Sequence, residues 1–109
     1  MGLKSKTKGK VGEREVAELL REFGFNARRG QQFSGSPDSP DVVSDMDGFH
    51  IEVKRTAKQT DLFAAIEQAK RDRKEGEDAL VFHRKNNKDW IVAMDAREFL
   101  RLVVKYVFA

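Results

Sequence analysis

The sequence of 109 residues contains no cysteine, only two prolines and a single tryptophan. The absence of cysteine excludes disulfide bonds, thiol catalysis and zinc sites with cysteine ligands. No apolar run approaches the roughly 20 residues that a membrane span requires. The basic N-terminus also lacks the apolar segment of a secretory signal. We therefore expect a soluble protein of the cytoplasm, with one domain that is large enough to bury a core without covalent staples.

Positive charge is concentrated at the N-terminus, although the net charge of the whole chain is only +3. The first ten residues contain no acid and four lysines, namely Lys4, Lys6, Lys8 and Lys10. A basic segment on a nearly neutral body predicts a polyanionic partner such as nucleic acid. We expect residues 1–10 to form a flexible basic arm and residues 11–109 a single folded domain. A solubilising tail without a partner is the alternative.

Hydrophobic periodicity and turn residues predict the order αβββαββα, an α/β domain with a mixed sheet. Helices are expected at residues 11–23 and 61–74, and from Asp95, the expected cap, to near the C-terminus. Five short strands are expected between them, at residues 25–29, 41–44, 49–55, 79–83 and 90–94. The last helix is apolar around most of its circumference. One of its faces is expected to pack on the sheet, and the rest to need another partner.

The predicted strand 49–55 alternates, so that His50, Glu52 and Lys54 share one face. A turn at residues 47–48 joins it to the preceding strand. A two-residue loop there places Asp41 opposite Lys54, and a four-residue loop places it opposite Glu52. In both registers Asp41 shares a face with Glu52 and Lys54. His50 lies on the same face, and we interpret it as an ordinary hairpin residue.

A third acid, Glu13, falls just inside the apolar stripe of the first helix, where an unpaired acid is costly. Carboxylates that lie close together repel unless a cation lies between them. With Asp41 and Glu52, such a set of oxygen ligands suits Mg²⁺ or Mn²⁺. The ordinary alternatives are a polar stripe that faces solvent and a first-turn acid that complements the helix dipole.

These residues resemble a known nuclease motif. Pro40-Asp41, followed by Glu52-Val53-Lys54, resembles the motif of the PD-(D/E)xK nucleases. Residues 8–15 (KGKVGERE) look like the opening of the archaeal-type Holliday junction resolvases in that superfamily. Segments 28–35 and 81–86 resemble parts of small phage resolvase-like nucleases. The resemblance covers most of the chain and implies a restriction-endonuclease-like core that hydrolyses phosphodiester bonds of DNA.

The resemblance also implies roles for individual residues. Asp41, Glu52 and the carbonyl of Val53 would bind the divalent ion, with Glu13 acting through its outer shell. Lys54 would orient the attacking water and steady the phosphate.

Other candidates lie in the loop and in the second helix. Pro37-Asp38 is a second PD dipeptide, but Asp41 is preferred because a predicted strand follows it. Ser34 or Ser36 would match a serine that family members carry before the PD strand. Gln68 would match a glutamine near the active site, although the helical wheel turns it toward solvent.

The same resemblance implies DNA, and above all a four-way junction, as the partner, with no membrane and no small-molecule cofactor. Two symmetric incisions require two active sites related by a two-fold axis, so we expect a homodimer through the last helix. We expect the protein in the cytoplasm of a bacterium or of a phage-infected cell. Beside the N-terminal lysines, the candidate contacts to DNA are Arg28, Arg29, Ser34, Ser36, Arg55 and Lys58.

Two alternatives stay open. One is a nicking or repair-type nuclease for other branched or duplex DNA. The other is a DNA-binding module without catalysis, whose acids merely pair with lysines.

Overall fold

A computed structural model describes residues 2–30, 40–57 and 60–109, with side chains from residue 9 onward. The described residues contain three helices and five strands, in the predicted order αβββαββα. The helices are α1 (Gly2–Glu22), α2 (Leu62–Asp72) and α3 (Ala96–Val107). The strands are β1 (Ala27–Arg29), β2 (Val42–Ser44), β3 (Phe49–Thr56), β4 (Asp78–Lys85) and β5 (Ile91–Ala93). The expectation of a single mixed α/β domain is confirmed.

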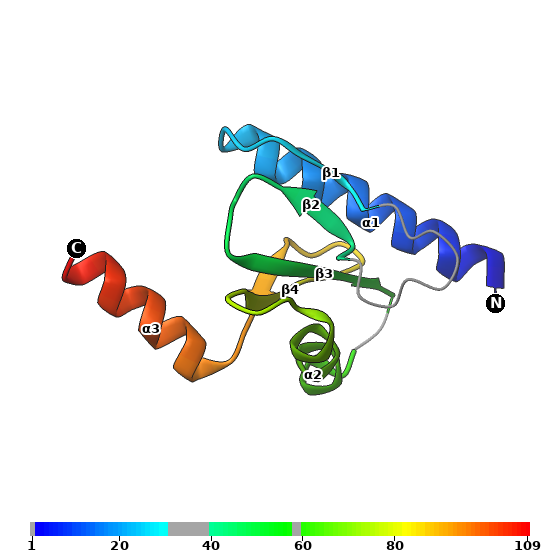
Figure 1. The fold of residues 1–109 in the computed structure, drawn as a ribbon. Helices are drawn as coiled ribbons and strands as arrows, with labels where there is room; N and C mark the ends of the chain where they lie inside the picture. The colour runs from blue at the N-terminus through cyan, green and yellow to red at the C-terminus, as the bar shows by residue number, and fades with distance from the viewer. Residues whose placement is uncertain (1, 31–39, 58–59) are drawn as a thin grey trace.

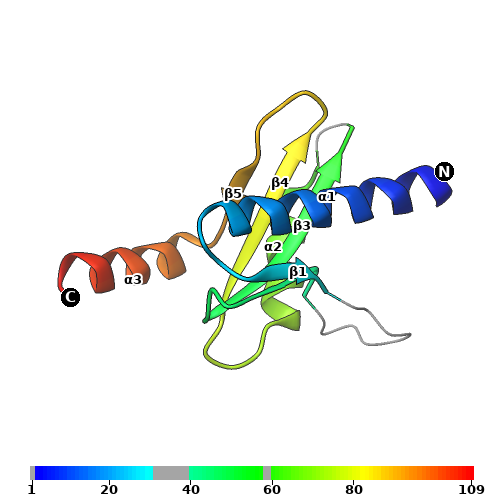
Figure 2. The same ribbon diagram turned by 90° about the horizontal axis from the view of Figure 1, so that it is seen from above.

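The five strands form one sheet in the order β1-β2-β3-β4-β5. The pair β3 and β4 is parallel, and the other neighbours are antiparallel. Parallel strands need a crossover, and α2 supplies it. Helix α1 lies across one face of the sheet and α2 lies against the other (Figures 1 and 2). The two central strands are therefore covered on both sides.

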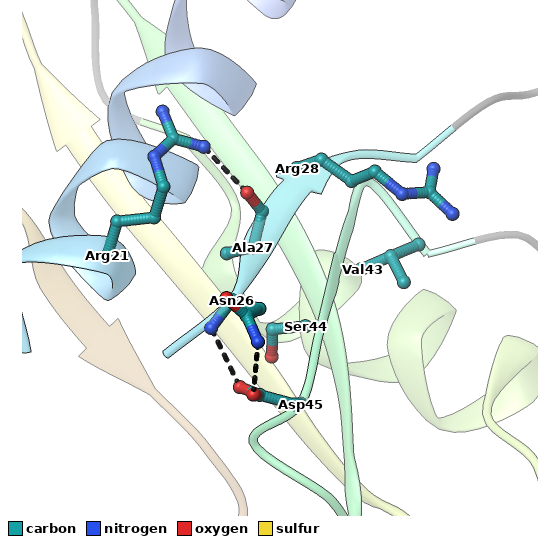
Figure 3. A pocket seen from close by; sticks show the side chains of 7 residues that line it. All are labelled: Arg21, Asn26, Ala27, Arg28, Val43, Ser44 and Asp45. Carbon is teal, nitrogen blue, oxygen red and sulfur yellow. Dashed lines mark hydrogen bonds between the residues drawn. The ribbon is translucent and has the colours of Figure 1, made fainter. Parts of the chain in front are cut away.

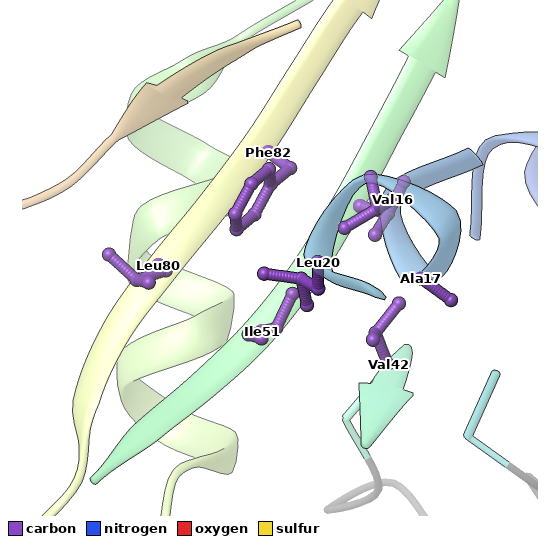
Figure 4. Close-up of a cluster of buried hydrophobic side chains, with 8 residues drawn as sticks. Val16, Ala17, Leu20, Val42, Ile51, Leu80 and Phe82 are labelled. Carbon is purple, nitrogen blue, oxygen red and sulfur yellow. The ribbon is translucent and has the colours of Figure 1, made fainter. Parts of the chain in front are cut away.

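The larger core lies between α1 and the sheet (Figure 4). It consists of buried aliphatic and aromatic side chains: Val16, Ala17, Leu20, Val42, Ile51, Val53, Leu80 and Phe82. The core under α2 is made of smaller side chains: Ala65, Ala69, Ala79 and Val81. Because alanine projects little from a helix, α2 can approach the sheet closely.

Helix α1 begins at Gly2, and not at Val11 as predicted, so residues 2–10 continue the helix. Gly24 has φ +95° and ends it as predicted, and the N–H of Phe25 reaches back to the carbonyl of Leu20 at 3.1 Å. The predicted helix extended to Phe23, but this residue follows the helix end and is 74% exposed. Whether residues 1–10 act as a separate arm stays a prediction.

Helix α3 projects from the body of the protein (Figure 1). Asp95 caps it as predicted, accepting hydrogen bonds from the N–H groups of Arg97 and Glu98. Glu98 anchors the helix, because its carboxylate accepts from the Arg73 guanidinium and from the N–H of Ala79. Glu98 is the buried residue of α3, so the expectation that an apolar face of this helix packs on the sheet is wrong. Of the described helices, none is both long and apolar enough to cross a bilayer.

Candidate active site

The hairpin between β2 and β3 sets the position of Asp41. Val42 pairs with Ile51, which places Asp41 opposite Glu52. This is the register of the four-residue loop 45–48, one of the two registers that the sequence allowed. The N–H of Asp41 donates to the carbonyl of Ile51 at 2.9 Å. Asp41 and Glu52 are therefore neighbours across two strands, on the face that α2 partly covers.

The carboxylate of Asp41 is fixed by the backbone around it. Its Oδ2 accepts a hydrogen bond from the backbone N–H of Val53 at 2.8 Å. On the other side, the N–H of Gly30 donates to the carbonyl of Asp41 at 2.8 Å. A Cβ at Gly30 would lie 2.0 Å from the carbonyl oxygen of Pro40, so only glycine allows this approach. The backbone at Gly30, directly after β1, therefore packs tightly against Pro40 and Asp41 and fixes their position.

Asp41 and Glu52 form a buried acidic pair, with exposed fractions of 9% and 3%. Burial raises the pKa of Asp41 from 3.8 to about 7, and the charge of Glu52 and a hydrogen bond with it add to this effect. The charge of Glu13 contributes less. A divalent cation between two such carboxylates would offset their mutual repulsion. Carboxylate oxygens are the ligands that hard cations such as Mg²⁺ prefer. The donor set therefore fits the divalent metal that the sequence predicted.

Glu13 reaches this region from α1, on the opposite side of the sheet. Its Oε1 lies 3.0 Å from Nε of Arg29 in β1, and its side chain is 18% exposed. The charge of Glu13 nevertheless contributes to the raised pKa of Asp41. Arg29 is thus the partner of this partly buried acid, and the role of Glu13 in metal binding stays a prediction.

Lys54 follows Glu52 by two residues and lies on the same face. Its Nζ donates to Oε1 of Gln68 at 3.5 Å. Gln68 is half-buried and lies between Ala65 and Ala69 on α2, so the expectation that it points to solvent is wrong. The carbonyl of Lys54 accepts from Nδ1 of His83 at 2.9 Å. These contacts hold the lysine from both its backbone and its side chain.

His50, interpreted from the sequence as an ordinary hairpin residue, is instead buried against Glu52. It is 2% exposed, and its Nε2 lies 2.7 Å from Oε1 of Glu52. Burial lowers the pKa of His50, but the hydrogen bond and the charge of Glu52 outweigh this and raise it. The available signal was the spacing of two residues within an alternating strand, which places both side chains on one face.

Arg28 lies on the side of β1 that faces the same way as Asp41. It pairs with Val43, and Val43 alternates with Val42, which is in the α1 core. Arg28 also lines a shallow pocket over β1 and β2 (Figure 3). The acid of this pocket, Asp45, accepts from the backbone and side-chain nitrogens of Asn26 at 2.9 and 3.1 Å. The pocket lacks the paired carboxylates of the Asp41 region, so we place the chemistry at Asp41.

The second PD aspartate, Asp38, lies outside the described residues.

Only some of the other predicted contacts to DNA have described side chains. Lys10 is exposed on α1. Arg29 and Arg55 are in ion pairs, with Glu13 and Glu15. The remaining candidates lie outside the described residues or side chains: Lys4, Lys6, Lys8, Ser34, Ser36 and Lys58. The role of all these residues in binding DNA stays a prediction.

Known proteins share this sequence pattern and this fold. A family model described as archaeal Holliday junction resolvase (Hjc) matches residues 4–105. This chain belongs to that family. A solved structure of Hjc from Archaeoglobus fulgidus, a Holliday junction resolvase from an archaeal hyperthermophile, is 26% identical. The match covers 77% of this chain and 74% of that chain, with a TM-score of 0.56. No curated protein matches significantly.

Membership in the Hjc family confirms the resemblance that the PD and ExK motifs indicated. The similar solved structure confirms the resolvase fold. Together they support the expected class of protein, a Holliday junction resolvase nuclease.

Proposed function

We propose that this Hjc family member is a metal-dependent endonuclease that cuts four-way DNA junctions at a centre formed by Asp41, Glu52 and Lys54. Family membership supports the substrate class. The observation that carries the chemistry is the buried Asp41 and Glu52 pair, opposed across β2 and β3, with Lys54 on the same face. Such a pair is unfavourable for folding by itself, which favours a functional reason for it.

Asp41 and Glu52 are the residues that would hold the cation, with the carbonyl of Val53 as a further ligand and Glu13 in the outer shell. All these donors are oxygens, which suits Mg²⁺, with Mn²⁺ as a substitute. When bound, a divalent cation acidifies a coordinated water and offsets negative charge on the phosphate.

Lys54 and Glu13 complete the centre. The ammonium group of Lys54 is a compact cation that would orient the attacking water and hold a phosphate oxygen. Its contact with Gln68 keeps it on the face of Glu52. Glu13 would accept a hydrogen bond from water around the cation, with Arg29 fixing the direction of its carboxylate.

DNA would lie over the part of the sheet that α2 leaves open. Arg28 is exposed there, and Lys10 is a further exposed cation on α1. Such side chains bind phosphates without reading sequence. This arrangement supports an enzyme that recognises the shape of its DNA substrate.

A homodimer through α3 would supply the second centre that two symmetric incisions need. Helix α3 and its C-cap residue Phe108 carry exposed apolar side chains, which on the helix are Phe99, Leu100, Val104 and Val107. A helix of 12 residues is marginal in water by itself, so this projecting element gains most from a second copy. Sedimentation at working concentration tests this part, and a monomer would contradict it.

The test of the function is cleavage of labelled four-way junction, flap and linear duplex with Mg²⁺. We expect the junction to be cut in preference. Asp41→Asn and Lys54→Ala should bind the junction but cut it at least about 100-fold more slowly. Lys74→Ala, which removes an exposed lysine just before β4, at the end of the central strands away from Lys54, is the matched control and should cut normally.

Equal cleavage of all three substrates would contradict junction specificity and favour a nicking or repair-type nuclease. Binding without cleavage by the unmodified protein would favour a module without catalysis. Normal cleavage by Asp41→Asn would remove this assignment of the centre.

A further inference from the structure

Glu52 has a second partner besides Asp41. His50 precedes it by two residues in β3, and the two side chains lie on the face that α2 covers. The Nε2 of His50 and Oε1 of Glu52 are 2.7 Å apart, and the side chains are only 2% and 4% exposed. Glu52 is therefore held between His50 on one side and Asp41 on the other.

The chemistry of the contact assigns its direction. A carboxylate at this distance accepts, so Nε2 of the imidazole carries the hydrogen. A further acid, Asp72 at the end of α2, lies near both side chains. Ligand-type atoms of His50, Glu52 and Asp72 all lie within 4.8 Å of one another. Because an ionised carboxylate can only accept, His50 donates this hydrogen bond to Glu52.

This matters because a glutamate side chain has three rotatable bonds. A carboxylate that is free to choose its rotamer must be ordered when it binds a cation, and this ordering lowers affinity. A buried donor on one oxygen removes most of that freedom in advance. Partners of this kind commonly change metal affinity by about 10- to 100-fold when they are lost.

We propose that His50 is a positioning residue for the metal centre, whose Nε2–H holds the Glu52 carboxylate in the orientation that binds the cation. The proposal rests on the proposed function of Asp41 and Glu52. His50 acts through Glu52, and the fixed carboxylate is what it contributes.

The test is calorimetric titration of Mn²⁺ into the full-length protein without DNA. His50→Gln places an amide N–H near the position of Nε2, whereas His50→Leu fills similar space without a donor. We expect His50→Leu to weaken Mn²⁺ binding about tenfold or more and His50→Gln to retain most of the affinity. In cleavage, the Mn²⁺ concentration at half-maximal rate should rise by the same factor for His50→Leu.

A stability control separates positioning from general damage. Leu20→Ala weakens the α1 core, away from the acids, and should lower the unfolding temperature without changing Mn²⁺ affinity. If His50→Leu does not fold, His50→Asn replaces it, because its shorter amide falls short of Glu52.

Unchanged Mn²⁺ affinity in His50→Leu would overturn the proposal while leaving the proposed function intact. An equal loss of Mn²⁺ affinity in His50→Gln and His50→Leu would also overturn it, because a hydrogen-bond donor at position 50 would then make no difference to the affinity. If the unmodified protein neither binds Mn²⁺ nor cuts junctions, the proposed function itself fails.

Discussion

The two faces of β3 differ in what they bury. Toward α1, Ile51 and Val53 pack against branched and aromatic side chains. Toward α2, His50 and Glu52 are buried just as deeply, beside alanines of the helix. One strand therefore supplies stability with one set of residues and a reactive site with the alternate set.

The comparison shows how a small domain tolerates a buried acidic pair. Taking a carboxylate out of water costs several kcal/mol unless partners compensate for it. Asp41 has the N–H of Val53, and Glu52 has His50, but their mutual repulsion remains and raises the pKa of Asp41. Apolar burial on the α1 face offsets this cost.

The sharpest test of the comparison is Glu52→Gln. We expect the cleavage rate at saturating Mg²⁺ to fall about 1,000-fold, because one ligand of the cation is lost. The unfolding temperature without metal should stay the same or rise, because the repulsion with Asp41 is removed. Single-turnover cleavage and thermal unfolding measure the two effects. A rate within tenfold of the unmodified protein would show that the polar face is not the reactive one.

Ile51, the neighbour of Glu52 on the other face of β3, should affect stability and not cleavage. Ile51→Ala leaves a cavity under α1 and should lower the free energy of unfolding by about 3 kcal/mol. The cleavage rate per folded molecule should not change, because Ile51 faces away from the acids. Urea unfolding and cleavage at low temperature measure this. A loss of cleavage in protein shown to be folded would mean that the two faces are coupled.

The pH dependence of stability should depend on Asp41. Its pKa is raised from 3.8 to about 7, so the folded state holds this proton more tightly than the unfolded state. The resulting stabilisation is fully present below about pH 3.8 and is lost as the pH rises through about 7. The difference in unfolding temperature between the unmodified protein and Asp41→Asn, measured without metal across this range, isolates the effect. A difference that does not vary with pH would contradict it.

The smallest expected effect is on DNA binding and concerns Arg28 in the edge strand β1. Arg28→Ala should weaken junction binding several-fold at low salt and reduce the salt slope of log K by about one. Arg28→Lys keeps the charge and should keep the slope. Binding titrations at several salt concentrations measure both variants. An unchanged slope in Arg28→Ala would remove this residue from the DNA surface.

Local patterns were enough to predict much of this molecule. Alternation in residues 49–55 placed Glu52 and Lys54 on one face, and Asp41 joined them in either hairpin register, because both registers have the same parity. The order of elements and the cap at Asp95 also depend on neighbours in sequence, and the structure confirms them.

The errors come from contacts between segments that are distant in sequence. A helical wheel turned Gln68 to solvent, yet its side chain is half-buried and meets Lys54. The apolar pattern of α3 indicated packing on the sheet, yet the buried contacts of this helix are polar ones at Glu98, and the helix projects from the body (Figure 1). The burial of His50 against Glu52 was not predicted, because an alternating strand does not reveal whether a helix covers its polar side.

The sequence by itself determined which residues share a face, because side-chain direction follows from strand period alone. It also carried the acids and the lysine that indicate the chemistry. Only the tertiary structure decided how deeply those acids are buried and which groups touch them. Burial and pKa depend on the dielectric and the charges supplied by α1, α2 and β1, which come from other parts of the chain.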